Sequence, residues 1–156
     1  MSTQTESFKS QLSDPAAFVR VDLNDLDGPG LDWAVAQAAG IPVQFDPDQH
    51  QHQHVTMVWQ VYPHGLVPFR PSADWSDAGP LIRQFQMALT PESHYGAEGT
   101  EMSDRWIADI YYDGGDHYTT EPARDELVAA CRAIAVTKFG DTLNVPAELA
   151  RTCASN

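Results

Sequence analysis

Hydrophobic and polar residues alternate along three stretches of the chain, and each stretch predicts a β-strand. The three stretches are residues 18–26, 55–61 and 105–112. Successive side chains of a strand point to opposite faces, so each stretch would present one apolar face to a core. Shorter extended pieces follow the second and third stretches, at residues 66–69 and 117–120, and are expected to pair back as hairpins.

Three helices are predicted among these strands. The first is the alanine-rich segment 31–39, which ends at Gly40 because glycine readily adopts the left-handed conformation of a helix C-cap. The second is expected to begin at Pro80, since a proline at the first helical position loses no hydrogen bond. The last and longest is entered at residues 121–122 and ends at Gly140.

The order of these elements predicts an α+β fold in a single domain, with a mostly antiparallel sheet covered by helices and a long C-terminal helix. A chain of 156 residues has enough material for one domain with a core. We expect a polar, mobile leader over residues 1–17, the domain over residues 18–150 and a tail over residues 151–156. The polar, acidic residues 90–104 are expected to form an exposed, mobile hairpin loop.

The charge of the chain narrows the classes of partner. Nine basic residues against 22 acidic ones give a net charge of -13, which repels phosphate backbones and argues against nucleic-acid binding. A single small anion in a local basic pocket remains compatible with this charge, as does docking on a basic protein. No apolar run is long enough to span a membrane, so no membrane partner is predicted. Cys131 and Cys153 are read as reduced thiols of a cytoplasmic protein.

Three separated groups of residues recur together in one known family. They are residues 31–36 with Gly40-Ile41, residues 71–82, and a C-terminal group of Trp106, Ala108, Glu121-Pro122, 130–133, 138–141 and 145–149. In this order and spacing they resemble the NinX family of small tailed-phage and prophage proteins, over roughly residues 19–149. The tryptophan-containing segment 71–82 is the most specific part of the resemblance.

The resemblance implies a phage origin and an accessory, non-structural role inside the infected cell. It implies no biochemical activity, because the family's label carries none. Small phage accessory proteins often disarm host defences, either by sequestering a nucleotide signal or by gripping a host protein. The histidine-rich run 49–54, the acidic loop 92–104 and the Glu-Pro helix entry, where Thr-Pro is expected, depart from the family pattern.

Residues 69–82 contain the groups that a nucleotide site requires. Such a site needs an aromatic ring for the base, a guanidinium for phosphate, and N–H donors at a turn or a helix N-terminus. The ligand-binding residues predicted on this basis are Trp33, Tyr62, Phe69, Arg70, Ser72, Asp74, Trp75, Ser76, Gly79 and Arg83. A purely structural alternative is that Trp75 covers the sheet, Asp74 and Asp77 cap turns, and Arg70 pairs with a carboxylate.

Metal binding and catalysis have weaker support. His50, His52 and His54 alternate on an extended segment, so they would share one face at a separation that suits a common metal ion. No further ligand follows at a familiar spacing, and a polar, solvent-exposed loop is the preferred explanation of the run. Asp46 and Asp48, like a pairing of His64 with Asp74, match no hydrolase motif. We therefore predict no catalytic residue, no metal and no cofactor.

Three functions follow in order of preference. The first is non-catalytic sequestration of a small, anionic, nucleotide-derived ligand, which would counter host defence signalling in the host cytoplasm. The second is an acidic inhibitor that binds a host protein through the carboxylates at positions 92, 98, 101, 104, 109, 113 and 116. The third is a metal-dependent hydrolase. A homo-oligomer is expected, because ligand-sequestering proteins often place their sites between subunits.

Overall fold

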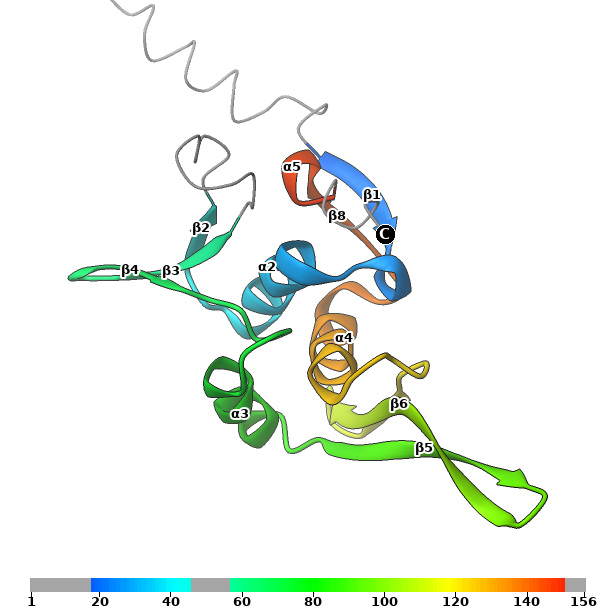
Figure 1. Cartoon of the computed structure of the whole chain (residues 1–156). Helices are drawn as coiled ribbons and strands as arrows, with labels where there is room; N and C mark the ends of the chain where they lie inside the picture. The colour runs from blue at the N-terminus through cyan, green and yellow to red at the C-terminus, as the bar shows by residue number, and fades with distance from the viewer. Residues whose placement is uncertain (1–17, 46–56, 151–156) are drawn as a thin grey trace, which may run out of the picture.

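Helices α2 and α4 lie side by side at the centre of the molecule, and three small antiparallel sheets surround them (Figure 1). The computed structural model describes residues 18–45 and 57–150. The elements are, in chain order, β1 (Phe18–Asp22), the 3-10 helix η2 (Leu23–Asp25), α2 (Gly28–Ala39), β2 (Val43–Phe45), β3 (Val58–Tyr62), β4 (Gly65–Pro68), α3 (Trp75–Gln84), β5 (Ala88–Gly96), β6 (Gly99–Tyr112), β7 (Asp116–Thr119), α4 (Glu126–Phe139), β8 (Thr142–Pro146) and α5 (Ala147–Ala150).

The strands form three separate sheets, in the orders β1-β8, β2-β3-β4 and β5-β6-β7. The first sheet joins the two ends of the described chain, because Phe18 lies opposite Pro146 and Asp22 lies opposite Thr142. The predicted α+β class is confirmed. The antiparallel strands are divided among three small sheets, whereas the sequence predicted mainly one.

Helix α2 begins three residues earlier than its alanine-rich pattern predicts. The Asp27 side chain accepts a hydrogen bond from the Gly28 N–H and caps the helix, and Pro29 occupies the first turn, where no N–H is needed. At the other end Gly40 has a φ of 70° and closes the helix in the left-handed conformation, as predicted. The end was predictable because a single residue type controls it.

Helix α4 is buried on almost every side. Nine of its 14 residues are buried, and it packs against α2, β5 and β6. It begins at Glu126 after the Asp125 cap, so the predicted entry at residues 121–122 was wrong. The backbone there is already paired, because Ala123 and Trp106 exchange two N–H···O bonds of 2.8 Å. At 14 residues the helix is not especially long, which corrects a further prediction.

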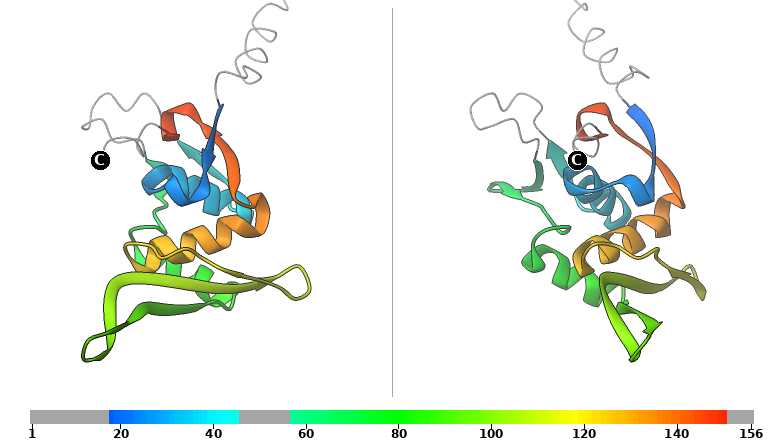
Figure 2. Two further views of the ribbon diagram at one scale, coloured as in Figure 1. Left: turned by 90° about the vertical axis from the view of Figure 1, so that its right-hand side faces the viewer. Right: turned by 45° about the vertical axis from the view of Figure 1, so that its right-hand side comes forward.

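Residues 90–104 form the exposed hairpin that was predicted, but they are paired strands and not a loop. This segment belongs to the long hairpin of β5 and β6, seen from two further sides in Figure 2. Backbone pairing continues to Gly96 and Gly99, and the Ser103 hydroxyl donates to the Glu92 carboxylate at 2.7 Å. The outer half of the hairpin lies in solvent on both faces, so it shows no hydrophobic alternation from which a strand could be predicted.

Candidate functional site

The loop between β4 and α3 is held against the protein interior by buried residues and by a hydrogen bond to helix α2. Phe69, Pro71 and Ser72 are buried, with Phe69 only 2% exposed. The Ser72 backbone N–H donates to the buried Asp32 carboxylate of α2, at a distance of 2.8 Å. Phe69 and Ser72 were predicted to contact a ligand, and the structure instead places both in the interior. Their apolar contact and hydrogen bond hold the loop in position.

Asp32 is a buried carboxylate of α2 that the sequence reasoning missed. Burial raises its pKa from 3.8 to about 7, because removal from water disfavours the charged form more than the two hydrogen bonds from Ser72 favour it. The negative charges of Asp27 and Asp77 raise this pKa further. The available signal was an acidic residue within the alanine-rich, apolar segment 31–39, where a buried charge needs a partner.

Helix α3 begins at Trp75, five positions before the predicted start at Pro80. Asp74 caps it by accepting the Ser76 N–H at 2.8 Å, and Asp77 accepts the Arg70 backbone N–H at 2.9 Å. Pro80 therefore lies inside the helix. The capping of turns by Asp74 and Asp77 agrees with the structural alternative, but Trp75 does not cover a sheet. Its side chain is 54% exposed.

One face of α3 beside Trp75 combines exposure with poor helix formers. Ser76, Gly79, Pro80 and Arg83 recur at the three- and four-residue spacing of a single helix face. Proline has no N–H to donate to the Ser76 carbonyl, and glycine in a helix interior costs about 1 kcal/mol relative to alanine. We call Trp75, Ser76, Gly79, Pro80 and Arg83 the α3 face. Gly79 and Pro80 are therefore expected to lower the local stability of the helix.

A Gly79→Ala substitution is expected to raise the free energy of unfolding by about 0.5–1 kcal/mol. A methyl group at this position would meet no atom within 4 Å, and the backbone there is compatible with alanine. Urea unfolding of the variant and the wild type measures the difference. A loss of stability would mean that Gly79 is required for packing and not retained for access to the helix.

Two arginines have unengaged side chains: Arg83, on the α3 face, and Arg70, in the loop before the helix. The other Lys and Arg side chains among the described residues each donate to a protein acceptor: Arg20 to Thr142, Arg105 to Pro122, Arg124 to Asp27 and Asp125, Arg132 to Leu26, and Lys138 to Gln37. Within residues 18–45 and 57–150, no hydrogen bond or ion pair engages the guanidinium of Arg70 or Arg83. Arg70 therefore does not pair with a carboxylate, although 22 acidic residues are present in the chain.

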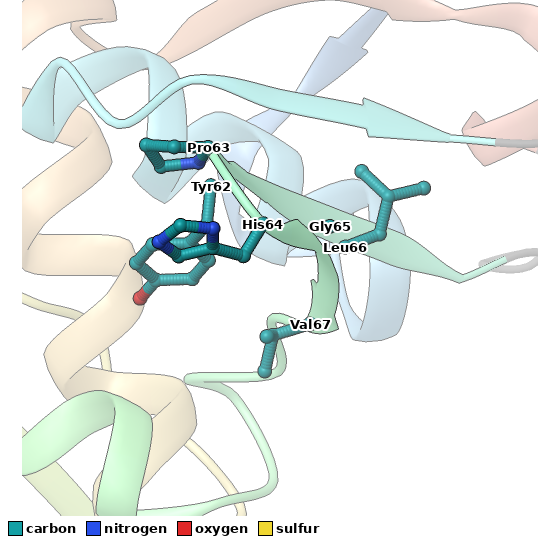
Figure 3. Close-up of a pocket in the computed structure, with 6 residues that line it drawn as sticks. All are labelled: Tyr62, Pro63, His64, Gly65, Leu66 and Val67. Carbon is teal, nitrogen blue, oxygen red and sulfur yellow. The ribbon is translucent and has the colours of Figure 1, made fainter.

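Trp33 and Tyr62 occupy other parts of the molecule. Trp33 is half-buried and packs against the core from α2, so it has a structural role. Tyr62 lines a surface hollow of about 370 Å³ that is formed by the β3–β4 hairpin alone, from Tyr62, Pro63, His64, Gly65, Leu66 and Val67 (Figure 3). The hollow is mainly apolar and contains no Lys or Arg, so it offers no cationic partner for a phosphate.

The catalytic and metal candidates gain no support from the described residues. Asp74, a proposed partner of His64, already caps α3. Cys131 is buried, which raises its thiol pKa well above the ordinary value and keeps it protonated. Residues 18–45 and 57–150 contain no group of three or more His, Cys, Asp or Glu that could hold a metal ion. The candidates Asp46, Asp48, His50, His52 and His54 lie outside the described residues.

A polar cluster on β6 and β7 was not predicted. The rings of Tyr111 and His117 stack with centroids 4.6 Å apart, and His117 Nε2 lies 3.3 Å from Asp109 Oδ1. The Thr119 hydroxyl donates to the same carboxylate. Positions 109 and 111 on one strand and 117 and 119 on the other share a face, so strand alternation could have indicated this cluster. Its contacts join the two strands side chain to side chain.

These features define a small α+β protein with an exposed tryptophan at the start of α3 and two unengaged arginines, one in the preceding loop and one in the last turn of the helix. The chain belongs to the Bacteriophage P22 NinX family, whose family model matches residues 22–138. The match spans helix α2, the loop before α3 and most of α4, which confirms the resemblance seen in the sequence. No curated protein matches the chain. Among the described residues, no helix is both long and apolar enough to cross a membrane.

Proposed function

We propose that this phage protein binds a small anionic ligand with an aromatic base, such as a nucleotide-derived signal, and sequesters it without catalysis. The observation that carries the proposal is the position of the two unengaged arginines. In a chain with a net charge of -13, the guanidinium groups left without partners in the described residues both belong to the segment that contains the exposed Trp75: Arg70 precedes it in the loop, and Arg83 lies in the last turn of α3. Both unengaged guanidinium groups therefore belong to residues 70–83.

The chemistry of the α3 face suits such a ligand. The Trp75 ring offers a face for stacking on a base, and each guanidinium offers paired N–H donors for phosphate oxygens. The Ser76 hydroxyl is an additional exposed donor. The proposed site is smaller than the one predicted from the sequence, because Phe69 and Ser72 are buried and Asp74 is used as a cap.

The loop contacts prepare the site before any ligand arrives. Asp32, Asp77 and Asp74 accept hydrogen bonds from the backbone N–H groups of Ser72, Arg70 and Ser76, respectively. These three hydrogen bonds hold the backbone on both sides of Trp75 in position. A preorganised aromatic loses little conformational freedom on binding, which improves affinity. A helix face covers only one side of a ligand, so we propose that a second copy covers the other side in a homo-oligomer.

The phage family gives the proposal its biological setting. A protein that removes a nucleotide signal in the cytoplasm of the infected cell would blunt a host defence that depends on that signal. The negative field of the rest of the chain favours a small ligand over a nucleic acid, because a long phosphate backbone would be repelled outside the α3 face.

Isothermal titration calorimetry with cyclic nucleotides and nucleotide–ribose compounds tests the proposal directly. We expect one compound to bind with a Kd below about 10 μM, since a sequestering protein must compete with the receptor of the signal. Trp75→Ala and Arg70→Ala are each expected to weaken binding by about tenfold or more without lowering the melting temperature appreciably.

An exposed arginine on another sheet provides the control. Arg20→Ala, on β1, removes a cation of the same kind and should leave the affinity unchanged. Binding no tighter than about 10 μM across the panel would contradict the proposal. Appearance of a chemically altered nucleotide in the same incubations would identify an enzyme instead.

A further inference from the structure

The outer half of the β5–β6 hairpin projects from the body of the molecule (Figures 1 and 2). A register irregularity between Pro91 and Ser93 separates it from the inner half, which packs on α4. None of the residues 93–102 is buried. We call residues 92–104 the hairpin arm. An isolated two-stranded ribbon is marginally stable in water, so the shape of the arm depends on contacts within the arm itself.

Polar side-chain contacts give the arm a defined shape. Ser103 donates to Glu92 at 2.7 Å near its base, and His94 Nε2 lies 3.3 Å from Glu101 Oε2 nearer its tip. A side chain at Gly96 would collide with the Glu101 carboxylate, so the glycine leaves room for this contact. The contacts support the strand pairing without any hydrophobic core, and they occupy the His94 and Glu101 face of the ribbon.

The opposite face of the arm exposes two large apolar side chains. Tyr95 lies opposite Thr100 and Met102 lies opposite Ser93, so Tyr95 and Met102 share this face as diagonal neighbours. Their exposed fractions are 90% and 57%. Tyrosine and methionine are enriched where protein interfaces bury their centres, because both bring large contact areas. Tyr95, which is nearly fully exposed on strand β5, is therefore well placed to insert into the surface of a partner protein.

The negative charge of the arm indicates the kind of partner that it can bind. Residues 92–104 contain four carboxylates and no Lys or Arg. Those of Glu98 and Asp104 form no ion pair within the described residues, so they are available to a partner. These carboxylates would repel a nucleic acid, and the acidic surface of a second copy of this chain, with a net charge of -13, matches the arm less well than a basic protein surface does. A ribbon of two strands encloses no small molecule.

We propose that the hairpin arm is a docking element for a basic protein surface, with Tyr95 and Met102 as its apolar anchors. The carboxylates of Glu98 and Asp104 set the charge complementarity, which speeds association and excludes acidic partners. This surface is separate from the α3 face and does not depend on the proposed small ligand.

Photo-crosslinking followed by reconstitution tests the docking element. Tyr95 is replaced by p-benzoylphenylalanine in the full chain, and the protein is crosslinked in bacterial cells. The protein captured in a discrete product is then purified, and its Kd for the uncrosslinked chain is measured at two salt concentrations. We expect a basic partner whose binding weakens about tenfold or more in the combined variant Tyr95→Ser and Met102→Thr.

Two further variants test the contribution of charge and provide a control for the loss of an exposed tyrosine. Glu98→Gln with Asp104→Asn should lower the association rate several-fold and reduce its salt dependence. Tyr111→Ser removes another exposed tyrosine, on the inner part of the same sheet, and should leave the Kd unchanged. Crosslinking only to a second copy, or no discrete crosslinked product, would disprove the docking element. So would an acidic partner, or a partner that binds the combined Tyr95→Ser and Met102→Thr variant as tightly as it binds the wild-type chain.

Discussion

Replacing Asp32 by asparagine is expected to abolish a loss of stability that the wild-type protein shows as the pH rises from about 4 to above 7. The pKa of Asp32 rises from 3.8 in the unfolded chain to about 7 in the fold, because burial disfavours its charged form. The folded state therefore binds a proton that the unfolded state releases. The stabilisation is complete below the unfolded pKa and disappears as the pH rises through the folded pKa. The shift corresponds to about 4 kcal/mol.

Asparagine is the informative replacement because it preserves the volume and retains an oxygen acceptor for the Ser72 N–H. Any packing cost of Asp32→Asn is constant with pH, whereas the contribution of the carboxyl group is not. Urea unfolding of both proteins across this pH range measures the difference in the free energy of unfolding. The exposed Asp116→Asn serves as the control. Wild-type and Asp32→Asn curves that run parallel would show that Asp32 does not titrate on unfolding.

Phe69→Ala is expected to destabilise the fold by about 3–5 kcal/mol, whereas Trp75→Ala is expected to cost less than about 1 kcal/mol. Phe69 is buried in the core, so its removal leaves a cavity between β4 and the helices. Trp75 is more than half exposed, and its removal uncovers little apolar surface. Both residues were predicted as aromatic contacts of one ligand, but the structure buries Phe69 in the core and leaves Trp75 exposed.

Thermal and urea unfolding of the two variants separates these roles. A stable Phe69→Ala protein would contradict the packing of the loop on the core. A large loss of stability in Trp75→Ala would return Trp75 to a structural role, and it would remove the basis for a ligand site at the α3 face. Phe69→Leu, which fills most of the same volume, should recover much of the stability that Phe69→Ala loses.

The parts of the fold that the sequence predicts correctly are those that one residue type controls locally. Gly40 ends α2 because the left-handed conformation favours glycine, and strand alternation locates β3 and the inner part of β6. Helix starts were predicted less well. Asp27, Asp74 and Asp125 each cap a helix, and aspartate is so common in this chain that its position alone does not single out a cap.

The structure separates the predicted site residues into exposed and buried ones, which the sequence did not distinguish. Trp75, Ser76 and Arg83 are exposed as expected, while Phe69 and Ser72 point into the protein. Whether a loop residue faces inward depends on Asp32, which lies 40 positions earlier in the chain and reaches Ser72 only after α2 has packed. Local patterns carry no information on such long-range contacts, and this explains why Asp32 was overlooked.

The pairing of β1 with β8 determines when the protein can complete its fold during synthesis. Strand β1 emerges from the ribosome early, but its partner is the last strand of the described chain. Helix α4, on which α2, α3 and the β5–β6 hairpin all pack, also emerges late. Helix α2 therefore stays without its main packing partner until residues 126–139 have been synthesised. A chain released before α4 has been synthesised would leave the apolar residues of α2 exposed, and we expect it to be open to proteolysis.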